Sequence, residues 1–199
     1  MQEQPTEDHI KETAKKIFFA EGRLHAKTQE IADEAGVNRA LIHYYFRNRE
    51  NLFNSVLKEA LADSYQETMS IIQSNLDFEE KIKEMISHMM DRLAKYPYMD
   101  TFIISEFNKN PDNLTMLKPH DDNEEHKNNF KKEIENYIIE HKLPVIKPEH
   151  FVVNIVSMCT YPFIAKSIFK EMLQYDDNLY EQFIAERKEV ITKFVLGKK

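Results

Sequence analysis

The stretch TQEIADEAGVNRALIHYYF, residues 28–46, contains Gly36, one of only three glycines among 199 residues. Apolar residues recur at helical spacing on both sides of it. A chain this poor in glycine needs a left-handed residue where one helix ends sharply, because only glycine adopts that conformation without steric cost. Thr28 is predicted to cap the first helix and Asn38 the second. The stretch therefore predicts a helix-turn-helix.

This arrangement divides the side chains of the helix-turn-helix into an inward and an outward face. The inward side chains are predicted to be Ile31, Ala32, Ala35, Val37, Ile42, Tyr45 and Phe46. The outward side chains of the second helix are Arg39, Ala40, His43, Tyr44 and Arg47. Helix-turn-helix proteins place the N-terminal part of the second helix in the major groove of DNA.

Arg39 has the geometry for a bidentate contact to guanine, and Ala40 leaves room for a thymine methyl group. Asn38 suits either a base or a phosphate. His43 and Tyr44, one turn further along, are better placed for phosphates. The helix N-termini at Thr28/Gln29 and Asn48/Arg49 offer free backbone N–H groups to phosphate oxygens.

An ordinary helical hairpin within a core is the alternative. The net charge of the chain is −7, which argues against nucleic acid as a partner. The location of the charge favours it, however, because residues 23–58 hold six Lys or Arg and only four acids, a local charge of +2.

The rest of the chain is predicted to be helical. Glycine and proline are scarce, and hydrophobic residues make up 42% of the chain, as in a globular all-α protein. We expect about nine helices. The first runs from Thr6, its cap, to about Gly22, and a long one follows Asn48. The final two cover about 149–173, with a bend at Pro162, and 177–196.

The sequence also bears on the compartment. The start, MQEQPTEDHI, lacks the features of a signal peptide, and no apolar run approaches the roughly 20 residues of a membrane span. The single cysteine, Cys159, lies in an apolar stretch, where a buried inert thiol is expected. These features predict a cytoplasmic protein that does not enter a membrane.

The pattern TxxIAxxAGVxxxxIxxYF resembles the DNA-binding signature of the tetracycline-repressor (TetR) family. AKKIFFAEG before it and RNRENLF after it are similar to that family's first and fourth helices. The resemblance is close over about residues 10–57 and extends to the architecture alone beyond residue 60. It implies a DNA-binding domain at residues 1–50 and a ligand-binding and dimerisation domain at residues 51–199.

The resemblance further implies a homodimeric regulator, usually a repressor, that binds a palindromic operator and is released by a small molecule. Thr28 and Gln29 would then touch the DNA backbone, and Asn38, Arg39 and Ala40 would read bases. His43 stands where the family commonly has an aromatic phosphate-binding residue, Tyr44 follows it, and Arg49 replaces the usual lysine.

The resemblance implies two further sites in the C-terminal half. An apolar effector pocket would draw on aromatic and methionine side chains: Tyr65, Met69, Met89, Phe102, Phe107, Phe130, Tyr137 and Phe163. A dimer interface in the form of a four-helix bundle would draw on Val152, Val156, Cys159, Phe163, Leu179, Phe183, Val190, Ile191 and Phe194. Plain core packing within one chain is the alternative for both sets.

Other functions have weaker support. The stretch HDDNEEH, residues 120–126, has metal-ligand residue types, but its two histidines lack i, i+4 spacing, and a solvated loop explains it equally well. No catalytic motif or Gly-rich phosphate loop is present, so neither an enzyme nor a cofactor is predicted. A DNA-bound protein-interaction factor with no effector remains an alternative, with the acidic loop around residues 120–129 as its contact.

Overall fold

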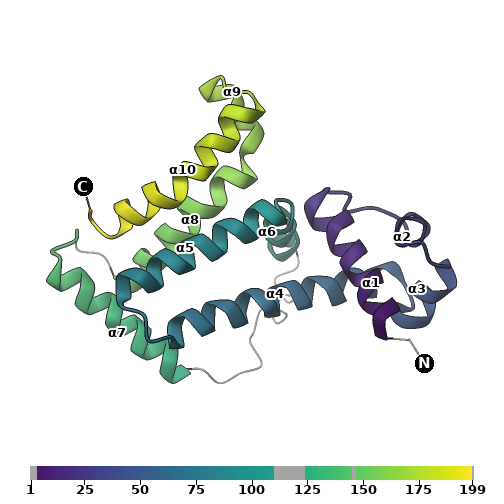
Figure 1. Cartoon of the computed structure of the whole chain (residues 1–199), viewed down its shortest axis with the longest axis horizontal. Coiled ribbons are helices and arrows are strands. Elements are labelled where there is room, and N and C mark those ends of the chain that lie inside the picture. Colours follow the sequence, from purple (N-terminus) through teal and green to yellow (C-terminus); the bar gives the residue numbers. More distant parts are fainter. Residues whose placement is uncertain (1–3, 110–123, 145–146, 199) are drawn as a thin grey trace. The chain divides into compact units, whose positions relative to one another are not determined.

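The computed structural model describes residues 4–109, 124–144 and 147–198 (Figure 1). The regular elements within these ranges are all helical, which confirms the all-α class. They comprise ten α-helices and one short π-helix, η1, against about nine helices predicted. Their bounds are α1 (Gln4–Lys15), η1 (Lys16–Ala20), α2 (Thr28–Ala35), α3 (Arg39–Phe46), α4 (Arg49–Gln73), α5 (Phe78–Lys95), α6 (Met99–Lys109), α7 (Glu124–Glu140), α8 (Pro148–Ile164), α9 (Lys166–Leu173) and α10 (Asp177–Val195).

The first helix differs from its prediction. It begins at Gln4, so Thr6 lies inside α1 and does not cap it. After Lys15 the backbone continues as η1, and Gly22 then adopts φ 71°. A Cβ atom at Gly22 would lie 2.8 Å from the ring of Tyr98, so this position requires glycine for space as well as for conformation.

The chain forms two packing units, and the first comprises residues 4–65 and 95–109 of the described chain. Its core collects one face of α1 and η1, the inward faces of α2 and α3, and the first half of α4. The fully buried members are Ile10, Ala14, Ile17, Phe18, Phe19, Ile31, Ala32, Leu52, Val56 and Met99. The backbone N–H of Tyr98 donates to the Phe19 carbonyl at 3.1 Å, which ties the start of α6 to η1.

This unit extends beyond the predicted boundary at residue 50. The helix α4 is continuous across that boundary, and its side chains as far as Ala60 belong to the core of the first unit. Phe102 packs there too, with its ring centroid 4.4 Å from that of Phe53. The assignment of residues 51–199 to ligand binding and dimerisation stays a prediction.

The second unit comprises residues 66–94, 124–144 and 147–198 of the described chain. Its core lies among α5, α7, α8 and α10. The most buried members are Ile82, Ile86, Met90, Leu93, Ile134, Phe151, Ile155, Cys159, Ile191 and Leu196. Lys81 is buried and forms an ion pair with Glu133 at 3.0 Å, which joins α5 to α7.

Pro162 is accommodated inside α8. Proline has no N–H, so the carbonyl of Met158, four residues earlier, loses its helical partner. The Nη2 atom of Arg187 in α10 donates to that carbonyl at 2.9 Å, and the Tyr180 hydroxyl donates to the Pro162 carbonyl at 2.6 Å. These bonds join α8 and α10, which lie side by side (Figure 1).

The predicted helix over residues 149–173 is in fact two helices. The helix is interrupted at Ala165, three residues after Pro162, and the axis of α9 makes an angle of 78° with that of α8. The expected bend is therefore present, but the prediction of one helix was wrong. Within the described residues no single helix is long and apolar enough to cross a membrane; only the sharply bent pair α8 and α9 together passes by length and composition.

A candidate DNA-binding face

The turn between α2 and α3 is formed as the sequence predicts. Gly36 has φ 64° and ψ 29°, the left-handed conformation, and the Val37 N–H donates to the Ala32 carbonyl at 3.0 Å. A Cβ atom at Gly36 would meet no atom within 4 Å. The requirement for glycine therefore comes from the backbone conformation alone.

Asn38 begins the second helix of the motif. Its Oδ1 atom accepts the N–H of Ala40 at 2.8 Å, which confirms Asn38 as the cap of α3. Its side-chain NH2 group is left to donate elsewhere. On the opposite face, Ile42 and Phe46 are buried as predicted, whereas Arg39, Ala40, His43 and Tyr44 are exposed.

The N-terminus of α2 is capped one residue earlier than predicted. Lys27 has extended backbone angles, and the Oε2 atom of Glu30 accepts the Lys27 N–H at 2.8 Å. Thr28 is the first helical residue, so the prediction that it caps the helix was wrong by one position. Gln29 donates from Nε2 to Asp33 Oδ1 at 2.7 Å, which leaves its second N–H and its Oε1 atom for a DNA contact.

The junction between α3 and α4 contains only two residues. Asn48 caps α4, since its Oδ1 accepts the N–H of Asn51 at 2.8 Å. Arg47 has φ 69° and ψ −50°, and the Asn48 N–H donates to the Phe46 carbonyl at 2.8 Å. This is a γ-turn with a positive φ at its centre, a rare conformation. For an L residue such a conformation costs roughly 1–3 kcal/mol.

Arg49 lies at the first position of α4 and turns towards its own unit. Its Nε atom donates to the Ala26 carbonyl at 2.9 Å, and its Nη2 atom donates to the Leu24 carbonyl. Its guanidinium carbon lies 5.3 Å from the Phe18 ring centroid and 5.8 Å from that of Phe53. Burial lowers the pKa of Arg49 from its ordinary value. These contacts fix the loop that leads into α2.

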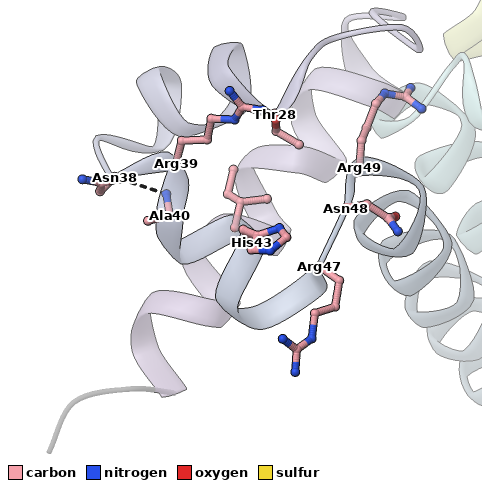
Figure 2. Close-up of a pocket in the computed structure, with 9 residues that line it drawn as sticks. Thr28, Asn38, Arg39, Ala40, His43, Arg47, Asn48 and Arg49 are labelled. Carbon is pink, nitrogen blue, oxygen red and sulfur yellow. Dashed lines mark hydrogen bonds between the residues drawn. The ribbon is translucent and has the colours of Figure 1, made fainter.

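A surface hollow of about 550 Å³ brings the two helix N-termini and the start of α3 together. Its lining comprises Thr28, Asn38, Arg39, Ala40, Ile42, His43, Arg47, Asn48 and Arg49 (Figure 2). Six of the eight predicted DNA-binding residues are in this set; Gln29 and Tyr44 are outside it. The sequence names Asn48 only for the backbone N–H groups at the start of α4. It assigns no DNA contact to Arg47, although the outward position of Arg47, four residues after His43, indicates one.

The charges of this unit are segregated. Most of the α2 carboxylates face cations on neighbouring segments: Arg23 pairs with Glu30 at 3.1 Å and with Glu34 at 3.0 Å, and Lys16 pairs with Glu34 at 2.9 Å. Neither Arg39 nor Arg47 forms an ion pair with any residue that the structure describes. Positive charge therefore faces the hollow unneutralised, as contact with phosphates requires.

Comparison with known proteins agrees with this geometry. Residues 10–56, which contain α2, the turn and α3, match the family described as bacterial regulatory proteins, tetR family. Residues 10–56 are thus a DNA-binding domain of the TetR family. Its helix-turn-helix is that family's DNA-binding motif.

Two relatives illustrate the similarity of sequence. Over 101 residues the chain is 30% identical to the HTH-type transcriptional repressor NicS of Pseudomonas putida, an alignment that covers 51% of this chain and about half, 48%, of NicS. Over 195 residues it is 22% identical to the "Probable HTH-type transcriptional regulator YttP" of Bacillus subtilis, with 92% of this chain and 90% of that protein covered.

Two solved structures share the fold. HlyIIR, a hemolysin II transcriptional regulator, has a TM-score of 0.59 at 24% identity, with 92% of this chain and 97% of HlyIIR covered. The fatty acid degradation regulator FadR from Bacillus halodurans has a TM-score of 0.52 at 19% identity, with 97% of this chain and 95% of FadR covered. The TetR-like fold thus extends over the C-terminal half.

The predicted effector-binding residues fall into both packing units. Tyr65, Phe102 and Phe107 belong to the first unit, and the other five belong to the second. In the second unit, Phe130 and Tyr137 are buried in the core, and Met89 and Phe163 pack against it. Met69 is buried as well. The structure shows these side chains as packed residues, and a role in effector binding stays a prediction.

The predicted dimer residues divide by exposure. Val152, Val156, Leu179, Val190 and Phe194 are exposed, with Phe194 at 68%. Cys159 and Ile191 are fully buried in the core of their own unit, so assigning these two to an interface was wrong. Phe183 is half-buried and its ring contacts those of Tyr175 and Tyr180. Of the stretch HDDNEEH, residues 120–123 lie outside the described residues.

Proposed function

We propose that this protein is a transcriptional repressor that binds a palindromic DNA operator as a homodimer and is released from it by an apolar small molecule. The observation that carries the proposal is the composition of the hollow at the start of α3. It combines two helix N-termini with Ala40, whose small side chain leaves room for a thymine methyl group. It also contains two arginines that form no ion pair within the described residues. The similarity to NicS, a transcriptional repressor, supports repression as the direction of control.

Dimerisation is supported by the exposed apolar side chains of α8 and α10. A single helix-turn-helix reads few base pairs, and two-fold pairing of two heads supplies the second half-site. The effector part of the proposal is supported by the methionine and aromatic side chains of the second unit, since residues of these types can line an adaptable apolar pocket. The proposed site of action is the cytoplasm, where the operator lies.

Fluorescence anisotropy tests the proposal. The purified protein is titrated onto a duplex from upstream of its own gene and onto a scrambled duplex, at near-physiological salt. Nanomolar binding to the native duplex with a preference of at least ~1,000-fold is expected. Equal and weak binding to both duplexes would contradict autoregulation. If no effector that binds the protein changes its affinity for DNA, the induction half of the proposal fails.

A further inference from the structure

Arg47 and Arg49 lie on either side of Asn48 at the α3–α4 junction, and their guanidinium groups point away from one another (Figure 2). The two residues carry the same charge and both line the hollow. They nevertheless differ in their exposure and in their hydrogen bonds. That difference indicates which of the two side chains contacts DNA and which stabilises the local fold.

The guanidinium of Arg49 uses two of its five N–H donors within its own unit. It donates to two backbone carbonyls, those of Leu24 and Ala26, and its carbon lies over the ring of Phe18. These bonds join the start of α4 to the loop before α2. Because a planar guanidinium forms a rigid fork, these two bonds fix its orientation, and it cannot turn further towards a phosphate without breaking them.

Arg47 has the opposite properties. Its side chain is exposed and forms no ion pair within the described residues, so all five of its N–H donors are available. Its backbone has φ 69° at the centre of a γ-turn, where glycine would be less strained. A strained position that nevertheless holds an arginine points to a use for the side chain, since strain of this kind collects at functional sites.

We propose that Arg47 is the phosphate-binding cation at this junction, whereas Arg49 is a positioning residue that holds the N-terminus of α2 in register with α4. The proposal deepens the proposed function and rests on it, because it concerns how the same face holds DNA. It reverses the sequence-based assignment of the phosphate contact to Arg49.

The test measures how binding to a mixed-sequence DNA duplex falls with salt, since this slope counts phosphate contacts and needs no operator. Arg47→Gly should reduce the slope by about one unit for each bound subunit. The same variant should unfold at a temperature roughly 2–4 °C higher, because glycine relieves the backbone strain. Arg47→Lys keeps the charge and should retain the slope.

Arg49→Gln is the matched variant. It should weaken binding by the same factor at every salt concentration, leave the slope unchanged and lower the unfolding temperature. An unchanged slope in Arg47→Gly, or a slope reduced in Arg49→Gln, would overturn the inference. Should Arg49→Gln fail to fold, Arg47→Gly decides alone. If the unaltered protein shows no salt-dependent binding to DNA, the proposed function itself fails, and the two failures are thus distinguishable.

Discussion

At the scale of single residues, the backbone of Gly36 decides the geometry of the motif. Its left-handed conformation lets α2 end and α3 begin within three residues. No neighbouring atom crowds the position, so a side chain there would strain only its own backbone. This separates Gly36 from Gly22, where a side chain would also meet the ring of Tyr98.

We therefore expect Gly36→Ala to lower the stability of the protein by about 1–2 kcal/mol. Gly36→Asn should cost less, because asparagine tolerates the left-handed region better than alanine does. Urea denaturation of the two variants checks this. Equal losses for alanine and asparagine would show that something other than backbone conformation fixes the glycine.

At the scale of helices, polar contacts between elements supplement the apolar core. Glu59 of α4 accepts from the Nζ atom of Lys15 in α1 at 2.5 Å, and Lys11 lies 3.3 Å from the same carboxylate. Lys15 is buried, so its charge depends on this partner and on Glu12. The two lysines anchor α1 on α4.

Glu59→Gln should destabilise the fold by about 1–3 kcal/mol at neutral pH, less than a fully buried pair would lose, because Glu59 is partly exposed. Burial tends to raise the pKa of Glu59, but hydrogen bonds from Lys15 and Lys11 outweigh it and hold the pKa below its ordinary 4.5. The contribution should therefore be present above pH 4.5 and disappear as the pH falls below that value. Thermal unfolding of both proteins from neutral to acid pH measures it; a difference independent of pH would contradict the ion pair.

Pro162 leaves free the Met158 carbonyl that Arg187 bonds, and a double-mutant cycle tests whether that bond depends on the proline. Arg187→Met leaves the Met158 carbonyl without its donor and should cost about 1–3 kcal/mol. In a Pro162→Ala background the same change should cost clearly less, because the backbone N–H of the alanine supplies the missing donor. Urea denaturation of the four proteins gives both costs. Equal costs in the two backgrounds would mean that Arg187 stabilises α8 in some other way.

The elements also show how far the sequence predicts this fold. The helix-turn-helix was predicted closely because its periodicity, Gly36 and the Asn38 and Asn48 caps all agree. The cap of α2 was missed by one residue, since Glu30 bonds a backbone N–H and thereby makes Lys27 the cap. The strained turn at Arg47 and the inward course of Arg49 have no local sequence signal. The course of Arg49 depends on the carbonyls of Leu24 and Ala26 in the loop before α2 and on the rings of Phe18 in η1 and Phe53 in α4.

At the scale of the whole molecule, the proposed function requires two subunits. Phe194 is the most exposed of the predicted interface residues. Phe194→Lys should therefore leave the fold intact, shift the protein towards monomer in analytical ultracentrifugation, and weaken operator binding. Lys83→Ala, which alters an exposed residue of α5, is the control and should change neither the dimer nor operator binding. A monomeric unaltered protein would contradict the homodimer.

The central claim is that the start of α3 reads bases, and selection of binding sites from random duplex DNA tests it most directly. The unaltered protein should select a palindromic sequence. Arg39→Ala should select the same sequence with one base pair of each half-site relaxed, a loss of about 1–3 kcal/mol of discrimination at that position. An identical, undiminished preference in Arg39→Ala would contradict the claim, because the recognition helix would then lie elsewhere.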